Sequence, residues 1–351
     1  MAEIVRGIEP PDETWRTRAR SRLDSLTKPL GSLGRLEDLA AQLVAIRQEH
    51  LALPLDKAVY VFAADHGIAA EGVSAYPSAV THQMVLNFLS GGAAVNALAR
   101  LHHAALRVVD VGVDADFNSN AGLLHYKISR GTRNMLREPA MTEEELSQAL
   151  QVGAQLAGEA AAEGRILLAV GEMGIGNTTS ASAITCALTG KAAPYATGRG
   201  TGLDSAGHQR KTAIVEAIMR SHFAADPAPD PLKILRCVGG LEIAAMTGMI
   251  LGAARHRLVA VVDGFISTAA AALATALEVR ARGYVIAGHR SEEPGHALLL
   301  DLLQIDPMLN MGMRLGEGSG AVLAMTVLDS AIALYSQMAT FASAGVSEAS
   351  V

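Results

Sequence analysis

The sequence predicts an α/β protein built on a doubly wound, mainly parallel sheet. Short runs of apolar, β-branched residues alternate with longer helix-like segments, an order typical of parallel strands joined by crossover helices. The runs are apolar along their whole length, which is typical of strands covered by helices on both faces. Half of the 351 residues are apolar and only 4% are aromatic, so aliphatic side chains build the core.

Five strands are expected, and each ends in a cluster of glycine with acidic, histidine or hydroxyl side chains. In chain order the strands begin at Ala58, Leu106, Arg165, Leu258 and Tyr284. The clusters that follow include Asp65–Gly67, Asp110–Asp116, Asp263–Gly264 and Gly288–His296. One such cluster is most often a turn. Five at one edge favour a ligand site, because open α/β sheets bind ligands outside the carboxyl ends of their strands.

Both ends of the chain are predicted to be helical. Residues 13–50 predict two helices broken at Pro29–Gly34, and residues 328–342 predict another. We expect these ends to pack together as a small helical domain, residues 1–45 plus about 328–351. The α/β domain then comprises residues 46–327.

Composition excludes several classes of protein. A net charge of -6 without a long basic run argues against nucleic acid as a partner. Cys186 and Cys237 form no metal-ligand spacing, so they are expected to be reduced core thiols. The N-terminus lacks the apolar segment of a secretory signal. The apolar stretch Gly264–Leu277 is too short to cross a bilayer, so a cytoplasmic protein without a membrane partner is expected.

The stretch LLAVGEMGIGNTTSASAI, Leu167–Ile184, combines a strand, a glycine-rich turn and the start of a helix. Glycines let the backbone approach an anion, and Thr178, Thr179 and Ser180 supply hydroxyls at a helix N-terminus. The spacing is GxxGxG, not the dinucleotide GxGxxG, and the lysine of a triphosphate loop is missing. One phosphate therefore fits better than two or three. The alternative is a helix cap on a tight turn.

Two more polar segments are candidates for the site. The segment Thr197–Lys211 adds backbone N–H groups and cations, and Lys211 either contacts a phosphate or solvates a helix face. Glu317 lies between Gly316 and Gly318, where little shields its carboxylate from a ligand. An exposed loop glutamate is the alternative.

The motifs ADHGIAAEGVSAYPSAVTHQMVLNFLSGGAAVN, GEMGIGNTTSASAI, GRGTGLD, VGGLEIAAMTG, VDGFISTAAA and RLGEGSGA occur in this order. With TKPLGSLGRLEDLA from Thr27, they resemble the nicotinate-nucleotide–dimethylbenzimidazole phosphoribosyltransferase family over nearly the whole chain. The resemblance implies a Rossmann-like domain, a smaller helical domain from both chain ends, and a homodimer whose active sites borrow contacts from the partner. It implies no cofactor and no metal.

The resemblance also implies the reaction and its residues. The phosphoribosyl group of nicotinate mononucleotide is transferred to 5,6-dimethylbenzimidazole or a related base, giving α-ribazole 5′-phosphate and nicotinate. Glu317 is expected to be the general base. The nucleotide site is expected to comprise Glu172, Gly174, Gly176, Asn177, Thr178, Lys211 and Ser291. The base site is expected to comprise Ser74, Gln83 and Leu315.

One base suffices for this chemistry. The nicotinate nitrogen is already a pyridinium and leaves neutral, whereas glycosidases need a second carboxyl to protonate their leaving group. A single displacement with inversion is therefore expected. An NAD-dependent oxidoreductase is a rival interpretation, disfavoured by the missing GxGxxG fingerprint. A non-catalytic nucleotide-binding sensor is another, disfavoured because Glu317 is retained.

Overall fold

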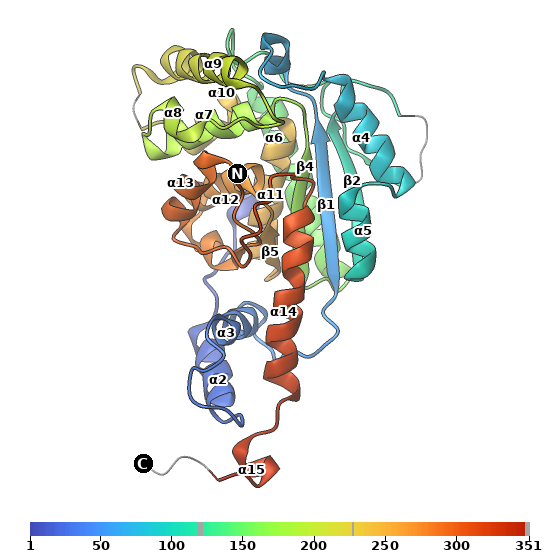
Figure 1. The fold of residues 1–351 in the computed structure, drawn as a ribbon, viewed down its shortest axis with the longest axis vertical. Coiled ribbons are helices and arrows are strands. Elements are labelled where there is room, and N and C mark those ends of the chain that lie inside the picture. Colours follow the sequence, from blue (N-terminus) through green and yellow to red (C-terminus); the bar gives the residue numbers. More distant parts are fainter. Residues whose placement is uncertain (118–121, 227, 348–351) are drawn as a thin grey trace.

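A six-stranded sheet forms the centre of the molecule (Figure 1), which is a computed structural model that describes residues 1–117, 122–226 and 228–347. The strands lie in the order β3-β2-β1-β4-β5-β6, and every neighbouring pair is parallel. The doubly wound α/β prediction is therefore confirmed. The strands are β1 (Lys57–Ala64), β2 (Ala104–Gly112), β3 (Leu123–His125), β4 (Leu167–Met173), β5 (Val259–Val262) and β6 (Val285–Ala287).

The strand order reverses between β1 and β4, so a crevice is expected outside the carboxyl ends of these two strands. All eight residues of β1 are buried, as the unbroken apolar run predicted. The edge strand β3 was not predicted, because three residues, one of them exposed, carry too little pattern.

Helices cover the sheet. The α11 helix contacts β1, β2, β4 and β5 and is itself covered by α6, whereas α14 contacts β4, β5 and α5. The helical segments are α1 (Ala2–Val5), α2 (Glu13–Asp24), α3 (Arg35–Arg47), η1 (Gly67–Glu71), α4 (Ala79–Ser90), α5 (Ala94–Leu101), α6 (Glu143–Ala162), α7 (Asn177–Thr189), α8 (Ala193–Ala196), α9 (Ser205–Phe223), α10 (Pro231–Val238), α11 (Leu241–Arg255), α12 (Phe265–Leu277), η2 (Val279–Tyr284), α13 (Pro294–Leu303), α14 (Ser319–Gln337) and α15 (Phe341–Ala344).

The two chain ends lie side by side. Figure 1 shows α2 and α3 next to the C-terminal half of α14, and the Arg22 Nε donates a hydrogen bond to the Tyr335 carbonyl (2.8 Å). The predicted helix after Leu328 begins earlier than expected, at Ser319, so α14 runs unbroken from the sheet edge to the helical end. The predicted break between α2 and α3 is present. The division into two domains stays a prediction.

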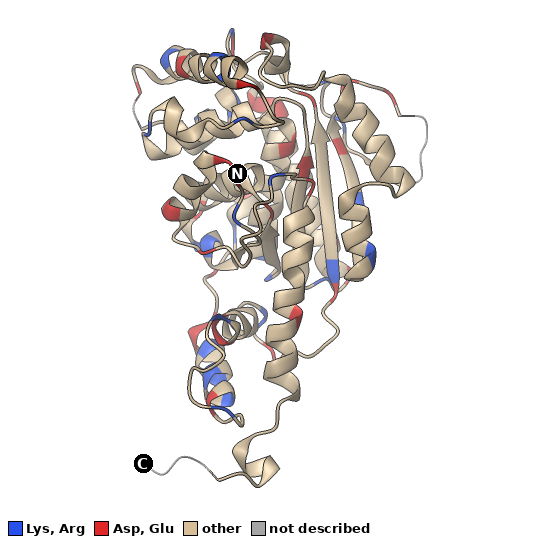
Figure 2. Ribbon diagram, viewed as in Figure 1, with Lys and Arg blue, Asp and Glu red and all other residues tan. Residues whose placement is uncertain are grey.

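Charge is unevenly distributed. In Figure 2 the ribbon of α2 and α3 is densely marked in blue and red for basic and acidic residues, whereas α14 contains a single charged residue, Asp329. By length and composition alone, two helical stretches could cross a membrane, Ala79–Leu101 and Ser319–Gln337. The prediction of no membrane partner was based on the shorter apolar stretch Gly264–Leu277, which did not indicate these two. The first comprises two separate helices, α4 and α5. The second is α14, and 56% of it is buried inside the protein, as in the core helices that pass the same test.

Candidate active site

A cleft of about 490 Å³ lies at the carboxyl ends of β4, β5 and β6. Its walls include the turn into α7, the start of α12 and the segments between β6 and α14, together with Tyr76, Gly200 and Thr201. Of the predicted site residues, the cleft is lined by Glu172, Gly174, Asn177, Thr178, Ser291 and Leu315. Sequence reasoning therefore brought together residues from distant segments of the chain.

Five predicted residues lie outside the lining: Ser74, Gln83, Gly176, Lys211 and Glu317, although Gly316 beside Glu317 belongs to it. Gly176 is the N-cap of α7 and faces His66. Ser74 exchanges a hydrogen bond with the Thr201 hydroxyl (3.0 Å), and Thr201 does line the cleft. Gln83 is an exposed residue of α4. Gln83 is not among the described residues that line the cleft.

The start of α7 offers an anion site. Its N-cap, Gly176, has φ +102°, and no side chain of that residue caps the helix. The Lys211 Nζ donates to the Thr178 Oγ1 (2.8 Å) from a fully buried position. Burial lowers the pKa of Lys211 to about 8, although nearby Glu293 raises it. The amine is therefore still mostly protonated at neutral pH, and it acts on the cleft through Thr178.

Glu172 is a buried carboxyl on β4. Its Oε2 accepts a hydrogen bond from the Asn177 amide (2.5 Å), and its Oε1 lies against Gly316, where a Cβ atom would approach within 2.4 Å. Burial, together with Asp263 and Glu242, raises the pKa of Glu172 to about 8. Glu172 is thus largely protonated at neutral pH and can donate a hydrogen bond into the cleft.

Glu317 occupies an unusual turn. Its φ is +65°, and its neighbours Gly316 and Gly318 have φ of +88° and +84°, so three successive residues are left-handed. The turn packs directly on β4, where a Cβ at Gly171 would lie 2.6 Å from the Glu317 carbonyl oxygen. Only glycine leaves room for the turn at that point.

The Glu317 carboxyl is poised to accept a proton. It is 7% exposed, and its Oε2 has no hydrogen-bond partner among the described residues. Burial and then Asp263 raise the pKa of Glu317 to about 7, while the Val95 N–H lowers it. A base is most effective when its pKa lies near the working pH, so this carboxyl suits proton abstraction near neutrality.

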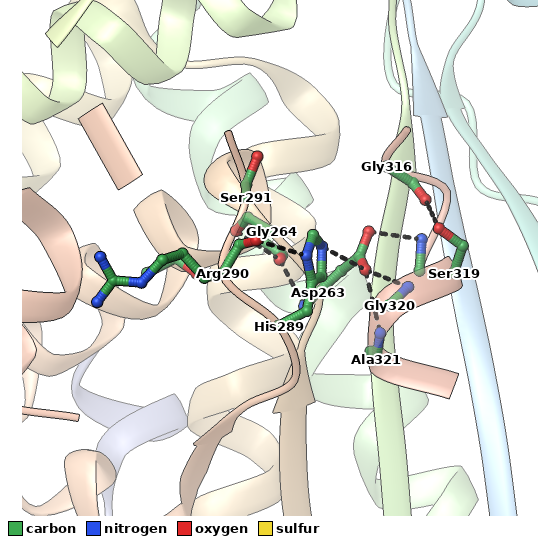
Figure 3. A network of polar contacts seen from close by, with 12 residues as sticks. Asp263, Gly264, His289, Arg290, Ser291, Gly316, Ser319, Gly320 and Ala321 are labelled. Atoms are coloured by element: carbon green, nitrogen blue, oxygen red, sulfur yellow. Dashed lines mark hydrogen bonds and ion pairs between the residues drawn. The ribbon is translucent and has the colours of Figure 1, made fainter. Parts of the chain in front are cut away.

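A polar network ties the turn to the sheet (Figure 3). Asp263 follows β5 and accepts hydrogen bonds from backbone N–H groups at the start of α14. His289 lies 3.5 Å from Asp263 and hydrogen-bonds the Arg290 carbonyl. Burial lowers the pKa of His289, but Asp263 and this carbonyl outweigh burial and raise it.

Sequence reasoning left several lining residues out of the site. These are chiefly Tyr76, Thr201, Asp263, His289 and Arg314. The clusters at the ends of the fourth and fifth predicted strands already contained Asp263 and His289, and Arg314 precedes Glu317 in the same motif. The position of Asp263 and His289 at strand ends was therefore the signal that could have assigned them to the site. No such position marks Tyr76. Among the described residues, no group of three or more His, Cys, Asp and Glu side chains could hold a metal ion.

A cleft at the carboxyl ends of parallel strands, with a helix N-terminus beside it, is the arrangement in which α/β enzymes bind nucleotide phosphates. The sequence model of a family described as phosphoribosyltransferase matches residues 8–346. The nicotinate-nucleotide–dimethylbenzimidazole phosphoribosyltransferase of Chloroflexus aggregans is 50% identical over 99% of this chain and 98% of its own. The enzyme of that name from Geotalea uraniireducens is 48% identical over the same shares.

Solved structures agree. The crystal structure of the enzyme of that name from Thermus thermophilus superposes with a TM-score of 0.90 at 44% identity, covering 96% of this chain and all of that one. The chain belongs to the nicotinate-nucleotide–dimethylbenzimidazole phosphoribosyltransferase family.

Proposed function

We propose that this protein transfers the phosphoribosyl group of nicotinate mononucleotide to 5,6-dimethylbenzimidazole or a related base, giving α-ribazole 5′-phosphate and nicotinate. The observation that carries the proposal is Glu317, a buried carboxyl with a pKa of about 7 next to a cleft that also reaches the start of α7. The names of the relatives supply the substrates.

The donor nucleotide is proposed to lie with its 5′-phosphate at α7. The open helix N-terminus, the Thr178 hydroxyl and the buried Lys211 cation favour a single anion there. Ser291 lines the same cleft. Protonated Glu172 and its partner Asn177 are placed to hydrogen-bond the ribose hydroxyls.

The acceptor base is proposed to bind beside Leu315, which is 56% exposed and lines the cleft. Ser74 is linked to this region through Thr201. Gln83 completes the proposed base site only through a shift of α4 or a contact made by a second subunit.

The chemistry is proposed to be one displacement at ribose C1′. A ring nitrogen of the base attacks C1′ as the bond to nicotinate breaks, and the pyridinium electrons return to a neutral pyridine nitrogen. The second nitrogen of the base loses its proton to Glu317. General-base help of this kind is typically worth about 10²–10⁴-fold, and positioning of two ligands in one cleft supplies much of the rest.

We further infer a cytoplasmic homodimer with two domains, residues 1–45 plus about 328–351 and residues 46–327. The resemblance supports the dimer, and the contacts of α2 and α3 with the end of α14 support the helical domain. The α3 helix runs to Arg47, so the proposed boundary after residue 45 falls within its last turn. Light scattering should give a mass of twice 36.5 kDa, and a monomer at working concentration would remove the dimer from the proposal.

The direct test is incubation with nicotinate mononucleotide and 5,6-dimethylbenzimidazole, with both products followed by chromatography and mass spectrometry. We expect nicotinate and α-ribazole 5′-phosphate in equal amounts. Binding of both ligands without product would identify a non-catalytic sensor instead. Hydride transfer to an added nicotinamide cofactor would favour the oxidoreductase.

A further inference from the structure

We propose that Asp263 is the positioning residue of this reaction: its carboxylate holds the turn that carries Glu317 in a reactive orientation. The Asp263 carboxylate is engaged by the backbone of α14, so it acts through Glu317 and not on the reacting atoms. The inference rests on the role proposed for Glu317. It concerns what holds the base, which the proposed function leaves open.

The first observation is the set of bonds that Asp263 makes. Its Oδ1 accepts from the Gly320 N–H (2.6 Å) and the Ala321 N–H (3.0 Å), and its Oδ2 accepts from the Gly318 N–H (3.1 Å). Figure 3 shows the carboxylate pointing at the first turn of α14. Asp263 is 3% exposed, so these bonds are made away from water and are charge-assisted.

The second observation is that α14 has no side-chain cap of its own. The N-cap is Gly318, and the Ser319 hydroxyl is turned back to donate to the Gly316 carbonyl (2.7 Å). The helix therefore borrows its cap from the end of β5. Since a left-handed backbone is costly for a non-glycine residue, Glu317 keeps φ +65° only while its neighbours are held. Asp263 holds Gly318, the residue that follows Glu317, by accepting a hydrogen bond from its N–H.

The third observation is the charge around Glu317. The carboxyls of Asp263 and Glu172 face it from β5 and β4, and the Val95 N–H faces it from α5. Burial and Asp263 raise the pKa of Glu317 to about 7. Asp263 in turn faces His289, whose Nε2 lies 3.5 Å from the Asp263 Oδ1 and whose Nδ1 lies 3.1 Å from the Arg290 carbonyl oxygen.

A buried aspartate that caps backbone N–H groups can be merely structural, and this chain contains a matched example. Asp110 ends β2, is 1% exposed, and its Oδ1 accepts from the N–H groups of Gly112 (3.1 Å) and Val113 (2.9 Å). Its Oδ2 is paired with Lys127 (3.2 Å). Asp110 is not one of the groups that shift the pKa of Glu317. The Asp110→Asn variant therefore controls for the general effect of removing a buried carboxylate that accepts hydrogen bonds from backbone N–H groups.

The experiment compares Asp263→Asn with Asp110→Asn through the pH dependence of kcat and kcat/KM. Asparagine keeps one acceptor oxygen, places an N–H₂ group against a backbone donor, and removes the charge. For Asp263→Asn we expect turnover to fall by about 10- to 100-fold, because displacing a reactive group by about 1 Å costs that much. The acidic limb of the profile should also move to lower pH, since a negative neighbour of Glu317 is lost.

Asp110→Asn should lower the melting temperature and leave the acidic limb in place. An unmoved limb in folded Asp263→Asn would overturn the inference, as would equal shifts in both variants. If Asp263→Asn does not fold, His289→Gln serves instead. Loss of the ring that faces the Asp263 carboxylate leaves that charge less well compensated, so the limb should move to higher pH; an unmoved limb would overturn the inference.

The outcome is separable from that of the proposed function. Product formation by the wild type, with loss of turnover in Glu317→Gln, establishes the reaction and its base whatever Asp263 does. Failure of Asp263→Asn to shift the profile then removes only the positioning role.

Discussion

Two helices begin at the same edge of the sheet and use their N-termini in opposite ways. Both α7 and α14 start after a left-handed glycine N-cap, Gly176 and Gly318, that offers no side chain to the first turn. At α14 the carboxylate of Asp263 fills the place of the missing cap. At α7 the first turn faces the cleft, with Thr178 and the buried Lys211 beside it.

The difference shows how one local motif takes two roles. A helix N-terminus attracts negative charge, and either a protein carboxylate or a ligand can supply it. Where the protein supplies the anion, the helix is anchored and can hold a base in a strained turn. Where the protein leaves the terminus open, the substrate's phosphate is proposed to complete it. The predictions below test each half of this contrast.

The largest effect is expected at the anchored end. Glu317→Gln keeps the shape of the side chain and removes the proton acceptor, so turnover should fall by about 10²–10⁴-fold while both ligands still bind. Product assays measure the first quantity and calorimetry the second. Turnover near that of the wild type would remove Glu317 as the base.

A smaller effect is expected at the open end. Lys211→Met keeps much of the buried volume and removes the charge behind Thr178, so KM for nicotinate mononucleotide should rise by about 10-fold or more. KM for nicotinate riboside, which lacks the phosphate, should hardly change. Lys28→Met is the matched control, because Lys28 is also buried but pairs with Glu37 (2.9 Å) in the helical end. Equal losses for both donors would mean that the α7 turn is structural.

The smallest effect is expected on the free energy of unfolding, and it concerns the buried carboxyl of Glu172. Burial raises the folded-state pKa of Glu172 to about 8, whereas the unfolded value is about 4.3. The folded protein therefore keeps a proton that the unfolded chain releases in this range, and stability falls as pH rises from about 4.5 to about 8.

Glu172→Gln removes this linkage, so the variant should gain stability relative to the wild type at about pH 8 compared with about pH 5, by roughly 1 kcal/mol or more. Urea unfolding at the two pH values measures the difference. Identical pH dependence in both proteins would show that Glu172 is ionised when folded.

The open N-terminus of α7 was easier to predict from the sequence than the anchored N-terminus of α14. The α7 turn is contiguous in sequence, so the strand, the glycines and the hydroxyls of Leu167–Ile184 could be interpreted together. The cap of α14 comes from Asp263, 55 residues before Gly318, and only the folded sheet brings the two together. For the same reason Asp263 was seen as part of a strand-end cluster but not given a role.

The same difference between local sequence signals and long-range contacts applies to the prediction of the fold. Five strands were predicted because each is an apolar run. The β6 strand is as short as β3, but all of its residues are buried and apolar, whereas β3 ends in an exposed histidine and gave no signal. The start of α14 was misplaced because its first residues, Ser319 and Gly320, have low helix propensity and follow two glycines of the turn. Tertiary capping by Asp263 overrides that preference.

The configuration of the product tests the account most directly. Two of the carboxyls that line the cleft are not placed to act as nucleophiles, because Glu172 is largely protonated and Asp263 is engaged by the backbone of α14. With Glu317 as the one base, a single displacement is predicted, and a β-linked donor should give an α-linked product. The measurement is NMR assignment of the anomeric proton in the product formed from nicotinate mononucleotide and 5,6-dimethylbenzimidazole, with nicotinate release followed in parallel without acceptor. The account predicts the α-anomer and no release without acceptor. A β-anomer, or steady release without acceptor, would contradict it.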